Sequence, residues 1–415
     1  MIAFHYPPCF GSSGVLRTLK FSRYLPAHGW HPTVLTVHPR AYPGVNASQM
    51  GEIPSDVQVI RAFGLDSHRH LAIRGKSLGL TALPDQWSSW CIGAVAAGLR
   101  LIHAARPDVI WSTYPVASAH LIGLMLHRLS RIPWVADLRD LMIDESHPRT
   151  RSARAAHRWI ERRIVRHAQR VVFTTPSTEK LYLDSYPELS RERCRVIRNG
   201  YDEADFDAPP AGVIGADAPD RPQRLVHSGL IYEEERDPRP FFRALARLQR
   251  DGIVKADTLR VDLRASGSEA RFAALIRDMG LEPMVRLLPP LPYREALRDS
   301  AEASALIVLQ GPTCDRQIPA KVYEYLRIGR PILALTTPEG DTGQLLAECG
   351  GSTIVPLLDE DAIYHAVPPF LDALRMHSHA IPDPRIVGQY ARQSQAGDLA
   401  VCLTEVRMAA APRAA

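Results

Sequence analysis

Two oppositely charged side chains stand three residues apart in a segment that is otherwise largely apolar. The segment PAKVYEYLRIGRPIL, residues 319–333, contains Lys321 and Glu324. Side chains at this spacing share one face of a helix, and a carboxylate among apolar neighbours needs a partner. A ribose offers two hydroxyl donors to one carboxylate, and a neighbouring lysine suits a phosphate. The same spacing is also typical of a surface ion pair, so both interpretations stay open.

A second set of candidates lies in VHSGLIYEEERDP, residues 226–238. Ser228 and Gly229 follow a predicted strand, and Arg236 stands just before a predicted helix. Glycine lets the backbone approach a ligand closely, and a guanidinium is well suited to a diphosphate. These residues predict a phosphate-binding edge.

The N-terminal loop PPCFGSSGVLR, residues 7–17, offers a further anion site. Gly11, Ser13 and Gly14 lie between a predicted strand and a predicted helix. The free N–H groups and the dipole at a helix N-terminus favour an anion. An ordinary turn with a helix cap explains the same residues, and the sequence does not separate the two interpretations.

The segment VADLRDLMIDE, residues 135–145, places Arg139 and Asp140 directly after a strand. Charged groups at the carboxyl end of a parallel strand face the ligand-binding edge of a sheet. A structural ion cluster is the alternative interpretation.

These residues are positioned by short apolar strands that alternate with longer helices, which predicts parallel sheets covered on both faces. The pattern breaks once, in a segment rich in Pro, Ala, Gly and Asp, and then restarts. The predicted strands are 2–6, 33–37, 57–60, 108–112, 134–138, 170–175 and 195–197 before the break, and 224–229, 259–265, 285–289, 305–310, 331–335 and 352–356 after it.

The fold class is therefore α/β, with two Rossmann-like parallel-sheet domains facing a central cleft. We expect the C-terminal helix to cross back to the first domain. The predicted boundaries are an N-terminal acceptor-side domain, a linker, a C-terminal donor domain, a returning helix and a tail, at residues 1–202, 203–223, 224–384, 385–407 and 408–415.

Composition limits the class of protein. The chain has 415 residues, a net charge of +5 and six scattered cysteines. The mild charge gives no reason to expect nucleic acid as a partner, and scattered cysteines favour a reducing, cytoplasmic location. The residue group DFD at 205–207 lies in the predicted linker without a preceding strand, and HRH at 68–70 lacks further ligands. We therefore expect no metal, and we expect no other cofactor.

Basic residues are concentrated in RTRSARAAHRWIERRIVRHAQR, residues 149–170, where Glu161 is the single acid. Trp159, Ile160 and Ile164 are expected on one stripe of a helix, with arginines mainly on another. Such a helix can rest on an anionic membrane surface, which would make the protein peripheral to the inner face of the plasma membrane. The alternative is a solvated helix packed on its domain.

The motifs above, in this order and spacing, resemble the family-4 glycosyltransferases over nearly the whole chain. These are retaining enzymes of the GT-B fold, and the chain looks most similar to the bacterial subgroup that builds exopolysaccharide and other surface glycans. The sequence signals are HYPPCFGSSGVLR, VADLRD, VIRNGYD, SGLIY and PAKVYEYLRIGRPIL.

The resemblance implies that Glu324 binds the ribose of a nucleotide-diphosphate sugar and that the sugar is transferred to a glycan or lipid-linked acceptor. It implies a catalytic role for Arg236, Lys321 and Asp140. The remaining donor contacts would come from Gly11, Ser13, Gly14, Ser228, Gly229 and Arg316, and the acceptor side from Arg17, Arg139 and Asp140.

Two positions depart from the pattern of the resembled family. Arg316 stands where many members have a second glutamate, and the pair Arg139-Asp140 stands where many have His-Asp. Two other functions therefore stay open: a non-catalytic protein that binds sugar nucleotides, and a nucleotide-sugar epimerase of similar fold. An epimerase would need acid and base side chains around the sugar, and no such set stands out in the sequence.

Overall fold

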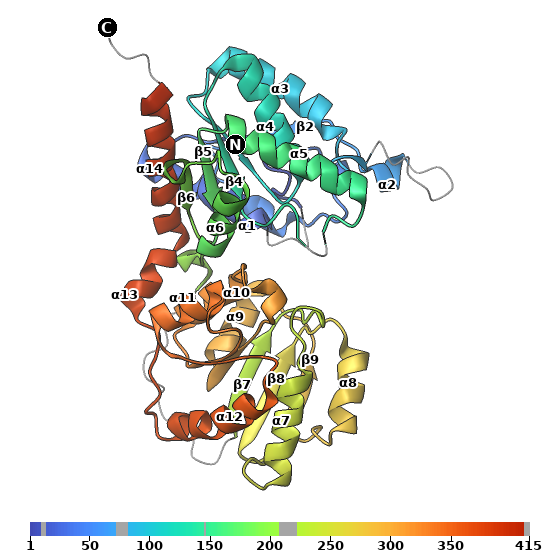
Figure 1. Cartoon of the computed structure of the whole chain (residues 1–415), viewed down its shortest axis with the longest axis vertical. Helices are drawn as coiled ribbons and strands as arrows, with labels where there is room; N and C mark the ends of the chain where they lie inside the picture. The colour runs from blue at the N-terminus through green and yellow to red at the C-terminus, as the bar shows by residue number, and fades with distance from the viewer. Residues whose placement is uncertain (10–13, 72–81, 145–146, 207–221, 411–415) are drawn as a thin grey trace. The chain divides into compact units, whose positions relative to one another are not determined.

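The computed structural model describes residues 1–9, 14–71, 82–144, 147–206 and 222–410. The chain divides into two compact units (Figure 1). Unit 1 comprises Met1–Asn199 and Arg392–Ala415, and unit 2 comprises Gly200–Ala391. Within the predicted linker, residues 207–221 lie outside the described residues, and Glu203–Asp205 form a 3-10 turn of unit 2.

Unit 1 is built on a parallel sheet. Ile2 bridges both Leu35 and Ser112, so the first residues of the chain lie between β1 and β3. The predicted strand 2–6 is reduced to this short pairing, because Pro7 and Pro8 follow at once and lack the N–H that a ladder needs. The strands are β1 (Thr33–Val37), β2 (Gln58–Ala62), β3 (Ile110–Thr113), β4 (Trp134–Leu138), β5 (Arg170–Phe173) and β6 (Cys194–Val196), with ladders β1-β2 and β3-β4-β5-β6.

Two layers of helices cover the sheet of unit 1. Helices α3, α4 and α5 bury one apolar face, and α14 packs with α1 over Trp111, Val135 and Val172 on the other. The helices are α1 (Gly14–Tyr24), α2 (Ser67–His70), α3 (Trp90–Ala105), α4 (Ala117–Ser130), α5 (Arg151–His167), α6 (Pro176–Ser185) and α14 (Arg392–Ala410). The C-terminal helix therefore belongs to the core of unit 1.

Unit 2 contains a six-stranded parallel sheet in the order β12-β11-β10-β7-β8-β9. Its first strand lies beside its fourth, so the chain leaves β7 and β10 in opposite directions. The carboxyl ends of two such strands diverge and leave a crevice where ligands bind in open α/β sheets. The strands are β7 (Gln223–Ser228), β8 (Leu259–Arg264), β9 (Val285–Leu288), β10 (Ala305–Leu309), β11 (Ile332–Leu335) and β12 (Ser352–Val355).

The helices of unit 2 also form two layers. Helices α7, α8 and α12 bury one face of the sheet, and α10 and α11 bury the other together with α13 (Figure 1). The helices are α7 (Arg239–Arg250), α8 (Glu269–Asp278), α9 (Tyr293–Ala301), α10 (Ala320–Ile328), α11 (Asp341–Cys349), α12 (Glu360–Arg375) and α13 (Pro384–Val387).

Helix α10 begins and ends where the sequence predicts. It begins after Pro319 and ends at Gly329, whose φ of 78° is the left-handed conformation that closes a helix. The predicted C-terminal helix at 385–407 differs in detail, because the short helix α13 and a 3-10 turn at Gly388–Tyr390 precede α14, which continues to Ala410.

Candidate functional site

The crevice residues of unit 2 gather where β7 ends. Gly229 follows the strand with a φ of +116°, a conformation that favours glycine. The backbone N–H of Ser228 donates to the hydroxyl of Tyr325 at 2.8 Å. Since Tyr325 belongs to α10, this bond fastens the helix to the carboxyl end of β7.

Lys321 lies in the first turn of α10 and reaches the same strand end. Its Nζ is 3.1 Å from Nε2 of His227, and a Cβ atom built on Gly229 would lie 2.8 Å from that Nζ. The pKa of Lys321 is lowered to about 7, mainly by burial and also by the positive charge of Arg236. The carboxylate of Glu324 acts in the opposite direction. The lysine therefore lies beside a second cation, and an added anion would favour its charged form.

Arg236 brings a second cation from the segment between β7 and α7. Its Nη1 donates to the backbone oxygen of Leu230 at 2.9 Å, and its guanidinium lies 5.5 Å from the ring centre of Tyr232. The side chain is 17% exposed, and the nearest carboxylate, of Glu235, is 4.0 Å away. The buried Nε has no hydrogen-bond partner among the residues that the structure describes. The guanidinium is thus held in place mainly by neutral groups.

Glu324 lies on α10, one turn after Lys321. Its apolar neighbours Val322, Tyr323 and Tyr325 are buried, whereas Glu324 itself is partly exposed. Its Oε1 accepts a hydrogen bond from the hydroxyl of Tyr293 at 2.7 Å. The carboxylate therefore lies at the surface of unit 2 with a hydroxyl donor against it, the kind of contact that a sugar hydroxyl also makes.

At the carboxyl edge of unit 1, Arg17 is fully occupied by internal contacts. Its Nε and Nη2 bind the two carboxylate oxygens of Asp137 at 2.9 and 2.8 Å. Nη2 also donates to the backbone oxygen of Ile197 at 3.0 Å, and Nη1 to that of Arg198 at 3.1 Å. The side chain is 1% exposed. Arg17 therefore ties α1 to β4 and to the end of unit 1, and none of its nitrogens is left to meet an acceptor.

Arg139 and Asp140 follow β4 as predicted. The Arg139 side chain is 8% exposed, and its Nε lies 3.4 Å from Oδ2 of Asp140, whose side chain is 42% exposed. Burial lowers the pKa of His5 to about 4, and the charge of Arg139 acts in the same direction. The edge thus holds a neutral imidazole, a buried cation and a more exposed carboxylate.

The other predicted residues are less informative. Gly11 and Ser13 lie outside the described residues, Gly14 begins α1, and Arg316 is exposed just before α10. Sequence reasoning missed His5, His227 and Tyr293. For His227 a signal was present, because it directly precedes Ser228-Gly229 at the end of a predicted strand.

The part of the chain that the structure describes contains neither a cluster of metal ligands nor a membrane-spanning helix. No group of three or more His, Cys, Asp or Glu side chains there could hold a metal ion. Within the same residues, every helix is too short or too polar to traverse a lipid bilayer.

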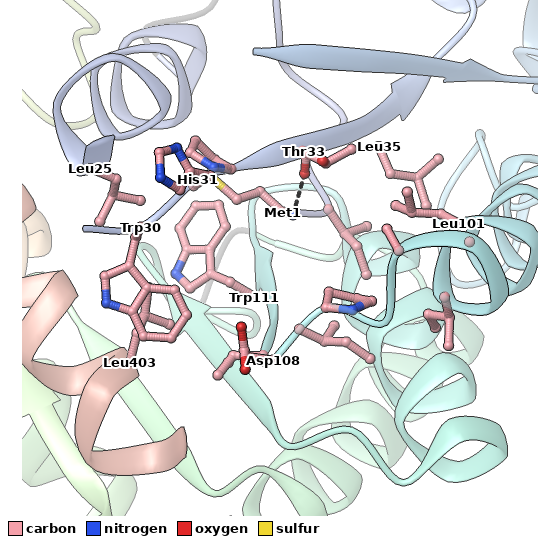
Figure 2. A pocket seen from close by; sticks show the side chains of 18 of the residues that line it. Met1, Leu25, Trp30, His31, Thr33, Leu35, Leu101, Asp108, Trp111 and Leu403 are labelled. Carbon is pink, nitrogen blue, oxygen red and sulfur yellow. Dashed lines mark hydrogen bonds between the residues drawn. The ribbon is translucent and has the colours of Figure 1, made fainter. Parts of the chain in front are cut away.

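An apolar cavity of about 230 Å³ lies elsewhere in unit 1 (Figure 2). Trp30, Trp111, Leu101 and Leu403 line it, together with the amino ends of β1 and β3. None of the predicted site residues lines this cavity. It therefore belongs to the opposite edge of the sheet from Arg139 and Asp140.

One family model and a set of solved structures are similar to this chain. Residues 14–200 match the sequence model of the Glycosyl transferase 4-like domain. No curated protein sequence matches the chain significantly.

Several solved structures match the chain over nearly its whole length. Anabaena HepE in complex with UDP and glucose is 14% identical, with a TM-score of 0.63 over 97% of this chain and 99% of that one. Sucrose-phosphate synthase from Thermosynechococcus elongatus is 14% identical, with a TM-score of 0.64 over 98% and 99%. The lipopolysaccharide outer core galactosyltransferase WaaB is 11% identical, with a TM-score of 0.62 over 97% and 98%.

Proposed function

Starting from a chain that carries a glycosyl transferase 4-like domain over residues 14–200 and has the GT-B fold throughout, we propose that the protein is a glycosyltransferase that uses a nucleotide-diphosphate sugar. The acceptor is a glycan or a lipid-linked sugar, and the reaction proceeds with retention and without a metal, in bacterial polysaccharide synthesis. The WaaB and HepE structures support the class of reaction and the UDP-sugar.

One observation carries the proposal. Lys321 and Arg236 place two cations at the crevice between β7 and β10, and the groups that they contact are mainly neutral. A diphosphate supplies the missing negative charge, and Glu324 stands one helical turn away for the ribose hydroxyls. The same arrangement would bind the nucleotide in a protein that lacks transferase activity, so turnover has to be measured separately.

The mechanism needs no protein nucleophile. Positive charge from Lys321 and Arg236 stabilises the diphosphate as it leaves, since fixed charges act most strongly where charge develops. The acceptor hydroxyl attacks on the face that the diphosphate leaves, and its proton passes to the departing phosphate. Asp140 and Arg139 orient the acceptor.

The test begins with binding. The melting temperature of the native protein is measured with UDP-, GDP-, ADP- and dTDP-sugars, because a ligand of the native state raises it. The donor that binds is then incubated with and without a panel of glycan and lipid-linked acceptors, and the anomeric configuration of the product is read by NMR.

Three results separate the candidate functions. Product that forms only with an acceptor, and with the donor's configuration, supports the proposal. A changed nucleotide sugar without acceptor would instead identify an epimerase, and binding without any turnover would identify a non-catalytic binding protein.

We further propose that α5 rests on an anionic membrane surface. Its arginines Arg151, Arg158, Arg162 and Arg166 are exposed. Trp159 is 46% exposed, so it lies outside the buried stripe of Ile160 and Ile164 where the sequence placed it, and the guanidinium of Arg163 is 5.0 Å from its ring centre. An exposed tryptophan among arginines is typical of a helix at a lipid interface.

The single acid of α5 does not offset this charge at the surface. Glu161 is 6% exposed and accepts hydrogen bonds from the hydroxyls of Tyr182 and Tyr186. Arg158 and Arg162 line a hollow of about 360 Å³ beside these tyrosines. The solvent-facing side of the helix therefore carries cations alone among its charged residues.

Flotation with vesicles that contain phosphatidylglycerol tests this surface. We expect the native protein to float at low salt and the variant Arg158→Glu/Trp159→Ala to stay in solution. Arg277→Glu/Arg375→Glu changes the charge elsewhere and serves as the control. Equal recovery of native and α5-variant protein with the vesicles would contradict the membrane proposal.

A further inference from the structure

His227 is a buried side chain at the end of β7 that the reaction scheme above does not use. It is 1% exposed. Its Nδ1 lies 3.0 Å from the backbone oxygen of Ile307 on β10, and its Nε2 lies 3.1 Å from Nζ of Lys321 on α10. The imidazole therefore connects the two strands of the crevice with the helix that carries the lysine.

These two contacts decide which nitrogen carries the proton. A backbone oxygen can only accept a hydrogen bond, so Nδ1 of His227 must donate to Ile307. Nε2 of the neutral ring then presents a lone pair, and an ammonium group has donors only. Lys321 is therefore the donor in the second contact, and the tautomer of His227 is fixed by the strand beside it.

The neighbours keep this imidazole neutral. Burial lowers the pKa of His227 well below its usual value, and the charge of Lys321 and that of Arg236 act in the same direction. Glu324 on α10 is the acid that favours a charged lysine, and the hydroxyl of Tyr325 is already the acceptor for the N–H of Ser228. The pair of His227 and Lys321 thus carries one positive charge at most, and it resides on the lysine.

A neutral hydrogen-bond acceptor can hold the ammonium of Lys321 in place without neutralising its charge, which an acid could not do. A lysine side chain has a long flexible stem and would sample many positions without an anchor. A carboxylate in the place of His227 would anchor it but would also cancel its charge. The imidazole fixes the ammonium against Gly229, where a Cβ atom would lie 2.8 Å from Nζ, and leaves the charge for a ligand.

We infer that His227 is a positioning residue, which holds the ammonium of Lys321 toward the diphosphate of the donor without neutralising it. This inference rests on the proposed function, because it assumes a nucleotide diphosphate in the crevice. His227 itself makes no contact with the substrate in this arrangement. Its effect on the affinity for the diphosphate should therefore depend entirely on Lys321.

The experiment measures nucleotide affinity by calorimetry. The native protein is titrated with UDP, GDP, ADP and dTDP, and the tightest ligand is then used together with its monophosphate. His227→Leu removes the acceptor, whereas His227→Gln keeps a neutral oxygen that can accept from Lys321. We expect the diphosphate affinity to fall about tenfold in the leucine variant, to recover to within about threefold of native in the glutamine variant, and the monophosphate affinity to change little.

A double-mutant cycle separates positioning from a merely structural role. Because His227 acts through Lys321, the variant His227→Leu/Lys321→Met should bind the diphosphate as weakly as Lys321→Met alone. Lys255→Met, at an exposed lysine before β8, controls for loss of charge. Melting temperatures check that each variant folds. If His227→Leu does not fold, the affinity of His227→Gln still tests the inference.

The outcomes distinguish the inference from the proposed function. A native protein that binds none of the four diphosphates would contradict the proposed function. A native protein that binds one of them, with additive losses in the double variant or an unaltered ratio of diphosphate to monophosphate affinity in His227→Leu, would overturn the role of His227 alone.

Discussion

Arg17 in unit 1 and Lys321 in unit 2 are both largely buried cations at the carboxyl edge of a parallel sheet, but their partners differ. Arg17 is neutralised by a two-pronged contact with Asp137, which is 0% exposed, and its other donors meet backbone oxygens. Lys321 meets a neutral imidazole, with Arg236 close enough to lower its pKa.

The type of partner therefore distinguishes charged side chains that stabilise the fold from those that can bind a ligand. The charge of a buried cation that is paired with an acid is neutralised within the protein. A cation paired with a neutral acceptor among other cations is costly unless an anion arrives. Arg224, at the start of β7, belongs with Arg17, because it binds Asp262 and Asp299 at 2.7 and 2.5 Å. The two ends of β7 therefore serve different purposes.

The largest effect is expected for Arg17→Met. Among the described residues, the substitution leaves the buried Asp137 with the hydroxyl of Thr113, at 2.7 Å, as its side-chain partner. Removing one member of a buried ion pair costs about 3–5 kcal/mol, and we expect a loss of that size in the free energy of unfolding in urea. Arg375→Met, at an exposed arginine paired with Asp372, is the control. A loss below about 1 kcal/mol would place Arg17 with the ligand-binding cations.

Arg236→Met should show the opposite pattern. Loss of one donor that stabilises developing charge lowers kcat by roughly 10²–10³. The melting temperature should stay near the native value, because no described acid lies within 3.5 Å of the guanidinium. Steady-state kinetics and thermal unfolding are measured on the same preparation, again with Arg375→Met as control. A native kcat, or a large fall in stability, would remove Arg236 from the reaction.

The sequence predicts the local part of this comparison well. Helix α10 is marked by Pro319 and Gly329, and the apolar spacing between them places Lys321 and Glu324 on one side of the helix. The rule that ligands meet the carboxyl ends of parallel strands then brings Ser228 and Gly229 to the same edge. Each of these steps needs only neighbouring residues or the order of strands.

The partners themselves could not be predicted, because they are set by tertiary packing. His227 and Lys321 are 94 positions apart, and Arg17 and Asp137 are 120 apart. Nothing in the local sequence shows that one cation meets an acid and the other an imidazole. Trp159 illustrates the same limit, since the side of α5 that is buried depends on the elements packed against it.

Glu324→Gln should have a smaller effect, on nucleotide binding. A hydrogen bond to a charged group contributes about 1.5–3 kcal/mol, so the affinity for the nucleoside diphosphate that the native protein binds most tightly should fall roughly 10- to 100-fold. The native protein should prefer that nucleotide to its 2′-deoxy form, and the variant should lose that preference. Tyr293→Phe keeps the carboxylate and should retain the preference. If Glu324→Gln discriminates between the two nucleotides as the native protein does, the carboxylate does not bind the ribose.

The smallest effect concerns pH and sharpens the contrast most directly. The pKa of Lys321 is about 7 in the folded protein, so the side chain loses its charge as the pH rises through that value. An anion binds the charged form, and the affinity for the same nucleoside diphosphate should therefore fall above pH 7, by up to about tenfold between pH 7 and pH 8.5. Arginine stays charged throughout this range, so the fall should be absent in Lys321→Arg. Ionisation of the nucleotide affects both proteins equally and cancels in the ratio of their affinities. Calorimetry across this range should give a ratio that changes with pH, and a constant ratio would show that Lys321 is as permanently charged as Arg17.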